Sequence, residues 1–237
     1  MEQAKKIRNT LGIEKEAVGV KYSDEATTAK LAKGQYAVCN GILEASNGKV
    51  IMLSKETCAC PGGRSHLGLT EMREVAHKLL GEGEQHGCDV KTATRSMIES
   101  EKIARPPLRI ASKVYLYPVS KNIFVPDLVI FLVNAEQVSS LITLAQFWDG
   151  KTPSFEMRGS LCWSSVTYPI ASGNFNITAG DISARRMAGW DENIMIASVP
   201  VEKVQGIADA IDKSTAGTAK PSREFEEITA MLKASRK

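Results

Sequence analysis

The sequence predicts a single α/β domain in which a mixed β-sheet is flanked by helices. Its clearest sign is the run Asp127–Val133, which is almost wholly apolar and rich in β-branched residues, as is typical of a strand buried on both faces. Helical periodicity follows directly from Ala135 to Trp148, and a strand followed by a helix indicates a sheet covered by helices. The chain has 237 residues and no internal repeat, which is enough to bury one full core.

The N-terminal part begins with a helix and continues with strands. Residues 2–11 carry apolar side chains three and four positions apart, which predicts a short surface helix. Residues 17–22 alternate as a strand does, and residues 36–39 begin another structured segment. Residues 49–53 follow Asn47–Gly48, so a strand leaving a turn is expected there.

The middle of the chain is expected to contain two helices and a strand. Residues 70–80 have one apolar face and a threonine suited to cap the first turn, so they predict a helix. A second helix is expected over residues 90–103, closed by the prolines that follow it. Residues 110–118 are then expected to form a strand, with valine and leucine on one side and tyrosines on the other.

The C-terminal part starts with a short apolar segment from 159 to 169 and a strand over 174–178. The segment 192–199 comes next, followed by a helix over 201–211. Residues 215–222 resemble a linker, and a last amphipathic helix is expected at 224–234. This linker joins the rest of the chain to a single tail helix and not to a second domain, so residues 1–237 are expected to form one domain.

Composition and charge narrow the classes of protein. A formal charge of +3, with the basic residues dispersed, does not indicate binding to nucleic acid. The charged N-terminus has no apolar segment behind it, so no signal peptide is expected, and the apolar run Leu128–Val133 is too short to cross a bilayer. With five cysteines, an odd number, a disulfide scaffold is not expected. A cytoplasmic protein with free thiols and no membrane partner is predicted.

The segment from Cys58 to Leu69 carries the strongest functional signal. Its two thiols, Cys58 and Cys60, lie one residue apart, and Pro61 stops a regular strand or helix from running through them. The glycine pair that follows allows backbone N–H groups to approach an anionic sulfur or phosphate closely. Outside disulfide-rich proteins, such a turn indicates a metal, an iron–sulfur cluster or redox thiol chemistry.

An iron–sulfur cluster is the preferred hypothesis, because cubane 4Fe–4S clusters are held by four thiolates and Cys-Pro often ends a ligand loop. The expected ligands come from distant parts of the chain, with Cys88 in reserve: Cys39, Cys58, Cys60 and Cys162. Asp181 is a further candidate ligand. Such a cluster would serve electron transfer, or redox catalysis on a small molecule; whether the protein is an enzyme stays open.

Other interpretations of the thiols remain open. A structural zinc ion would need His66 and His86 to complete a site, because the chain has no second closely spaced cysteine pair. Redox chemistry without a metal is possible at the cysteine turn, where Arg64 would favour a thiolate. Cys39 and Cys162 lie in apolar segments and can also be plain buried side chains.

A second class of function is the binding of an anionic small molecule or cofactor without a cluster. Gly62, Gly63 and Arg64 would offer N–H groups and a guanidinium to a phosphate or carboxylate. Arg185, close to Trp190, would form a second anion clamp with a stacking surface, although a structural ion pair explains Arg185 equally well. The other aromatic residues of interest are expected in the core or in an interface: Tyr115, Tyr117, Phe147, Trp148 and Trp163.

Several motifs together resemble a known family. In order along the chain they are Cys39, Cys60–Gly63, Leu67–Leu69, Val125–Phe131, Cys162, Ala184–Arg185 and Ile196–Pro200. This order resembles the uncharacterised proteins grouped as domain of unknown function 169, common in archaea and anaerobic bacteria. The resemblance extends from about Val18 to the helix after Pro200.

The resemblance implies a cytoplasmic α/β domain with recurring cysteines, and it implies no activity. Cys39, Cys60 and Cys162 match recurring cysteine positions. A further cysteine of the family often lies four residues before the arginine matching Arg185, where this chain has Asp181. Cys58 either replaces that thiol or the site is altered. A small-molecule ligand or a redox protein is the expected partner, and a homodimer is expected from base rates alone.

Overall fold

The computed structural model describes residues 1–70, 110–157 and 160–235. Its centre is a six-stranded sheet in the order β2-β3-β1-β4-β6-β5. The strands are β1 (Val18–Tyr22), β2 (Ile51–Leu53), β3 (Val114–Pro118), β4 (Leu128–Val133), β5 (Asn176–Thr178) and β6 (Met195–Pro200). The expected α/β domain is therefore confirmed. Strands β1 to β5 lie inside the segments that the sequence marks, and β6 extends one residue beyond the segment 192–199.

Neighbouring strands of the sheet pair antiparallel throughout, whereas a mixed sheet was expected. The cause is the position of β6. Strands β4 and β5 point in the same direction, but β6 pairs antiparallel with both and lies between them. The parallel neighbours that a strand–helix–strand unit would give are thus kept apart by the last strand of the chain.

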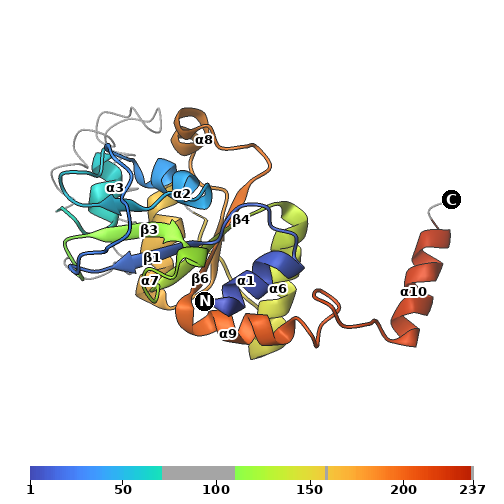
Figure 1. Cartoon of the computed structure of the whole chain (residues 1–237). Helices are drawn as coiled ribbons and strands as arrows, with labels where there is room; N and C mark the ends of the chain where they lie inside the picture. The colour runs from blue at the N-terminus through green and yellow to red at the C-terminus, as the bar shows by residue number, and fades with distance from the viewer. Residues whose placement is uncertain (71–109, 158–159, 236–237) are drawn as a thin grey trace.

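Helices cover both faces of the sheet, as Figure 1 shows. One face carries α1 (Glu2–Thr10), α6 (Ala135–Asp149) and α9 (Val201–Ala210), whose buried side chains form one core with the sheet. The other face carries α2 (Val38–Ser46), α3 (Pro61–His66), the π-helical turn η2 (Trp163–Thr167), α7 (Tyr168–Ser172) and α8 (Ile182–Ala188). A short 3₁₀ turn, η1 (Val119–Lys121), follows β3.

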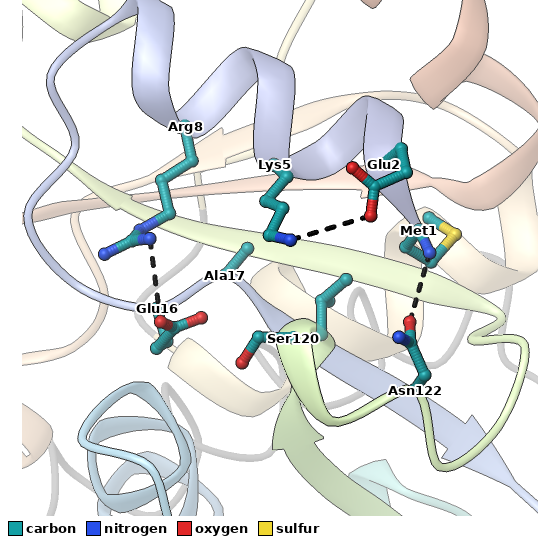
Figure 2. Close-up of a pocket in the computed structure, with 9 residues that line it drawn as sticks. Met1, Glu2, Lys5, Arg8, Glu16, Ala17, Ser120 and Asn122 are labelled. Carbon is teal, nitrogen blue, oxygen red and sulfur yellow. Dashed lines mark hydrogen bonds and ion pairs between the residues drawn. The ribbon is translucent and has the colours of Figure 1, made fainter.

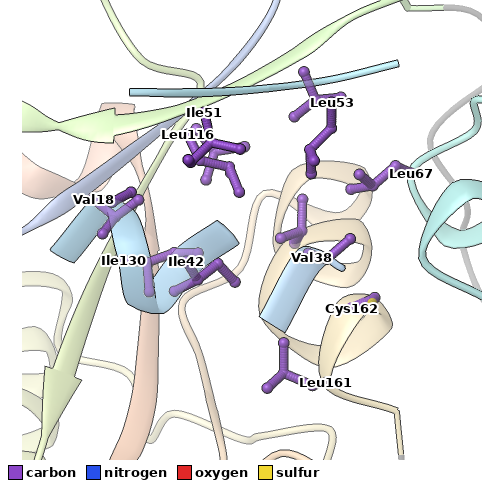
Figure 3. Close-up of a cluster of buried hydrophobic side chains, with 14 of the residues drawn as sticks. Val18, Val38, Ile42, Ile51, Leu53, Leu67, Leu116, Ile130, Leu161 and Cys162 are labelled. Atoms are coloured by element: carbon purple, nitrogen blue, oxygen red, sulfur yellow. The ribbon is translucent and has the colours of Figure 1, made fainter. Parts of the chain in front are cut away.

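Strand β4 shows how the sequence divides these two cores. Leu128, Ile130 and Leu132 belong to the core under α2, and the residues between them belong to the core under α6 and α9. All six residues of β4 are buried, which confirms the strand buried on both faces. The cysteine-bearing segments lie on the α2 side, in the core shown in Figure 3.

Helix α6 agrees closely with its sequence signals. The Asn134 side-chain oxygen accepts the Gln137 N–H, and the Gln137 side-chain oxygen accepts the Asn134 N–H. Together the two bonds form a capping box. Gly150 ends the helix with a φ of 69°, a left-handed conformation that glycine adopts without strain. Helix α9 confirms the prediction over 201–211.

Three helices on the α2 side differ from the sequence-based expectations. Residues 38–46 form α2, where only the start of a structured segment was expected, and α3 and α8 were not predicted. The apolar segment 159–169 is helical from Leu161 onward. Short helices of this kind owe their stability to packing and caps more than to periodicity. The helices expected at 70–80 and 90–103 lie outside the described residues, apart from Thr70.

The chain ends in α10 (Arg223–Ala234), which confirms the predicted tail helix. No side chain of α10 is buried, and Figure 1 shows the helix standing away from the rest of the chain. Over the residues that the structure describes, no helix has the length and apolar character needed to cross a membrane.

Candidate functional site

The four predicted ligand cysteines lie on one side of the sheet, on three separate segments. Cys39 is in the first turn of α2, Cys58 and Cys60 precede α3, and Cys162 directly precedes η2. Cys58 and Cys162 are buried in the same core, and Cys39 packs against it. Cys88 lies outside the described residues.

The backbone ties the first two segments together. Tyr36 and Cys58 form an isolated parallel β-bridge, in which the Tyr36 N–H donates to Thr57 at 3.1 Å and the Ala59 N–H donates to Tyr36 at 2.9 Å. The bridge holds the start of α2, and therefore Cys39, beside the cysteine turn. This contact lies between residues 22 positions apart, which is why sequence periodicity does not reveal it.

Helix α3 begins at the cysteine turn because its residues suit a helix start. Cys60 has extended backbone angles and its sulfur accepts the Gly63 N–H at 3.4 Å, as an N-cap side chain does. Pro61 occupies the first helical position, where its missing N–H costs no hydrogen bond. The Cys60 sulfur therefore already accepts the type of N–H···S bond that surrounds cluster sulfurs.

The segment of Cys162 is held by two polar contacts. The Asp181 carboxylate accepts the Leu161 N–H at 2.9 Å with one oxygen and the Ala184 N–H at 2.7 Å with the other. The Thr167 hydroxyl, at the end of η2, donates to the His66 carbonyl at 2.5 Å. These bonds join the helix after Cys162 to α8 on one side and to α3 on the other.

Electrostatics link the four thiols to one another. Burial is the largest effect, and it raises the pKa of Cys39 to about 11 and that of Cys58 to about 11. Burial also raises the pKa of Cys162 well above its ordinary value. The smaller repulsive effects run between every pair of the four cysteines, and Asp181 adds to them at Cys39 and Cys162. Ionising one thiol therefore opposes ionising the others.

This linkage predicts a loss of stability at alkaline pH. Because folding raises these thiol pKa values, their contribution is fully present below the ordinary thiol pKa of about 8.5. It is lost as the pH rises toward the folded-state values near 11. We expect the free energy of unfolding of the metal-free, reduced protein, measured by urea titration, to fall between those limits. In a Cys39→Ala/Cys58→Ala/Cys162→Ala variant that fall should be smaller; an unchanged slope would contradict the assignment.

Other buried polar groups lie around the thiols. The Tyr22 hydroxyl, the Arg64 Nε and the Ser65 hydroxyl make no hydrogen bond within the described structure. Burial raises the pKa of Tyr22, with smaller contributions from Asp127 and Cys162, so its hydroxyl stays protonated and can donate. Donors left without acceptors on the thiol side of the sheet are suited to an acceptor-rich group such as sulfide.

The glycine pair plays two different roles. A Cβ added to Gly63 would lie 2.8 Å from Val38 Cγ2 and 3.5 Å from the Cys58 sulfur, whereas one added to Gly62 would meet only the Cys60 sulfur at 3.8 Å. We therefore expect Gly63→Ala to destabilise the protein by about 1–3 kcal/mol, because α3 must move away from α2. Thermal unfolding of Gly63→Ala and the matched Gly62→Ala variant checks this, and equal effects would contradict it.

The two predicted anion-binding arginines, Arg64 and Arg185, have different hydrogen-bond partners. The Arg64 guanidinium donates one bond to the Lys55 carbonyl at 3.4 Å. Arg185 donates to the carbonyls of Asp191, Glu192 and Ile194 at 3.0, 3.3 and 2.7 Å, and so anchors the loop before β6. Within the described residues its hydrogen-bond partners are these backbone carbonyls, and anion binding by Arg185 stays a prediction. Trp190 is 7% exposed and packs into the core, so the expectation of a stacking surface there was wrong.

A metal site is not preformed in the described residues. Within ranges 1–70, 110–157 and 160–235, no three His, Cys, Asp or Glu side chains are arranged to hold a metal ion. The zinc alternative needed His86, which lies outside these ranges. Asp181 was considered as a metal ligand. Both of its carboxylate oxygens accept backbone N–H bonds, one from Ala184 at the start of α8 and one from Leu161 beside Cys162.

The aromatic residues divide between core and surface. Tyr115, Tyr117 and Trp163 are at most 2% exposed, which confirms them as core residues. Phe147 and Trp148 are 53% and 42% exposed at the end of α6. These two residues therefore remain candidates for an interface.

A polar crevice between α1 and the β3–β4 connection is shown in Figure 2. Its cavity measures about 10 Å³, which is roughly the space of one water. The charged groups that line it are paired, with Arg8 3.6 Å from Glu16 and Lys5 3.6 Å from Glu2. We therefore place no ligand there.

Sequence reasoning missed the residues that hold the thiol segments together. Asp181 followed by a helix and Gly189 is an N-cap and C-cap signature, so α8 could have been found from it. The Thr167 hydroxyl and the Tyr36 bridge carry no local signal, because their partners are distant in sequence.

Comparison with known proteins identifies the family. No curated protein and no solved structure matches the chain. The family model described as uncharacterised ArCR, domain of unknown function 169, matches residues 6–210, which extends the resemblance noted in the sequence toward the N-terminus. The match covers far more than half of the chain and includes all four candidate cysteines. The chain belongs to this uncharacterised family.

Proposed function

We propose that this protein binds an iron–sulfur cluster, of the 4Fe–4S type, through Cys39, Cys58, Cys60 and Cys162. The cluster serves electron transfer, or redox catalysis on a small molecule. The observation that supports the proposal best is that distant segments bring these cysteines to one side of the sheet. Cys58 and Cys162 are buried in the same core, Cys39 packs against it, and the Tyr36–Cys58 bridge holds the start of α2 beside the cysteine turn.

Charge supports a polynuclear metal group over a metal-free thiol site. Burial opposes ionisation of the Cys39, Cys58 and Cys162 thiols, and Arg64 is the one cation among the causes of their pKa shifts, acting on Cys58. A reactive redox cysteine needs a lowered pKa, and here the pKa values of Cys39, Cys58 and Cys162 are raised. The positive charge of an iron core would offset thiolate repulsion and deprotonate the ligands.

Local contacts of the thiols are of a kind that metal binding can replace. The Cys39 S–H donates to Asn40 Oδ1 at 3.5 Å, and the Cys58 S–H donates to the Cys60 carbonyl at 3.6 Å. Both are weak bonds, so breaking them costs little. Because the ligands must lose protons, cluster binding strengthens as the pH rises through the neutral range.

The surroundings suit a buried cluster. The Gly63 N–H already points at the Cys60 sulfur, and the Tyr22 hydroxyl is a further donor on the same side of the sheet. Hydrogen bonds to sulfur and burial set the reduction potential of such a group. A reducing, cytoplasmic setting is consistent with this chemistry.

The decisive experiment is purification of the full chain without oxygen, with iron, zinc and acid-labile sulfide measured per chain. About four iron and four sulfide, with visible charge-transfer absorption, are expected for a cubane cluster. Protein reconstituted with iron and sulfide that still carries neither would overturn the proposal. One zinc per chain without sulfide would replace it by a zinc site.

A further inference from the structure

Helix α10 presents an apolar stripe with no partner in the described structure. The large side chains Phe225, Ile228, Met231 and Leu232 lie three and four positions apart and are 53%, 55%, 72% and 61% exposed. By helical geometry Glu227 lies beside the stripe next to Met231, and Glu224 lies at the N-terminal end of the stripe. The Glu227 carboxylate also pairs with Arg223 at 2.9 Å, an exposed contact that contributes little stability. A helix of 12 residues is marginally stable alone in water, so we expect α10 to be stabilised by packing its apolar stripe against another surface.

A groove of matching character lies between the end of α6 and α9. It is a cavity of about 170 Å³ with Lys151 and Lys203 at its rim. Its lining combines the apolar Trp148, Pro153, Phe175 and Ile207 with the polar Thr152, Ser154 and Asn174. The Trp148 ring packs closely against α9 at Gly206, where an added Cβ would overlap it. Lys203 Nζ lies 5.6 Å from the centre of that ring. Asp149 also lines the groove, and its carboxylate accepts the Lys151 N–H at 2.9 Å.

We infer that α10 of one copy of this chain occupies the α6–α9 groove of a second copy, so that the protein is a helix-swapped homodimer. The apolar stripe of α10 covers the indole of Trp148 and its neighbours. Glu224 and Glu227 approach the lysines of the rim, which gives the contact opposite charges on its two sides. A two-fold dimer forms this contact twice.

The segment before α10 favours a second copy over the same chain. Asp212 pairs with Lys6 of α1 at 2.5 Å and accepts the Thr218 hydroxyl at 3.2 Å. The Thr218 N–H donates to Ile211 at 2.8 Å, and a Cβ at Gly217 would overlap the backbone of Ile211. The chain is thus folded onto the body through Ala219, whose N–H donates to Ser214 at 3.2 Å.

Only residues 220–222 remain as a spacer, and three residues span about 10 Å at most. From its pinned start this spacer directs α10 outward, as Figure 1 shows. Helix α10 carries three glutamates against one arginine and one lysine, so an anionic membrane surface is an unfavourable alternative. A neighbouring copy meets the exposed helix without any change in the turn segment.

Light scattering after size exclusion, together with dilution series, tests this inference on the full chain. A dimer is expected for the wild type. Ile228→Asp should raise the dimer dissociation constant at least about 100-fold, because it places an unpaired charge in the apolar contact. Ala230→Glu, on the opposite side of α10, is the matched control and should leave the dimer unchanged. A wild-type monomer, or a dimer indifferent to Ile228→Asp, overturns the inference.

A charge exchange and a cross-link separate the swapped arrangement from other contacts. Lys203→Glu should weaken the dimer about tenfold, and Lys203→Glu combined with Glu227→Lys should restore it. Benzoylphenylalanine placed at position 225 should cross-link on illumination to residues of the α6–α9 groove, in a product of twice the chain mass. The same cross-link within one chain would show folding back onto its own groove and would overturn the swap. None of these readouts depends on a bound cluster.

Discussion

Replacing Cys60 or Cys162 by serine is expected to abolish cluster binding. Iron and sulfide in anaerobically prepared protein should fall from about four of each per chain to less than about one, with loss of the visible absorption. Both sulfurs lie where the segments of the site meet, at the start of α3 and at the start of η2. A serine hydroxyl stays protonated at neutral pH and is a poor ligand for iron in such a cluster.

The fifth cysteine supplies the control for this experiment. Cys88→Ser should retain iron and sulfide, because the other four cysteines already complete the ligand set. Circular dichroism of each variant separates loss of the cluster from loss of the fold. Full iron content in both Cys60→Ser and Cys162→Ser would contradict the proposed ligand set.

Asp181→Ala is expected to cost about 3 kcal/mol of unfolding free energy, measured by urea titration of the metal-free protein. The substitution removes a charged acceptor from two backbone N–H groups at once, those of Leu161 and Ala184. The first holds the segment of Cys162 and the second caps α8. The same variant should bind less iron, because Cys162 is no longer held against the other thiols.

Two further variants define what Asp181 does. Asp181→Asn keeps one acceptor oxygen and should lose about half as much stability as alanine. Asp191→Ala also removes a local cap, in which the carboxylate accepts the Asn193 N–H at 2.8 Å, but that residue is exposed and holds no cysteine segment. It should cost less than about 1 kcal/mol and leave iron binding intact. Equal losses in Asp181→Ala and Asp191→Ala would contradict the role given to Asp181.

Much of the fold follows from local patterns in the sequence. The β4 segment, the periodicity of α6 and the amphipathic α10 are each recognisable within a short stretch of sequence, and all three elements are confirmed. The antiparallel pairing of β6 between β4 and β5 could not be read in this way. Strand order depends on contacts between segments that are far apart in the chain, whereas periodicity reports only which face of a segment is buried.

The candidate site was predictable in its residue types more than in its construction. Two cysteines one residue apart, followed by proline and two glycines, marked the turn before α3. The backbone contacts of Arg185 could not be predicted, because an arginine near the surface looks the same in the sequence whether it meets a ligand or three backbone carbonyls. The ties made by Tyr36 and Thr167 have no sequence signature, since a backbone carbonyl is available at every position.

The sheet has an unequal distribution of strand lengths, with three residues in each of its outermost strands, β2 and β5, and five or six in the inner four. Short edge strands leave few unpaired N–H and C=O groups with which a strand of a neighbouring molecule can pair. This limits fibril growth by the addition of strands at the two edges of the sheet. Two copies can therefore associate through the side chains of their helices, whereas association by strand pairing at the sheet edges is disfavoured.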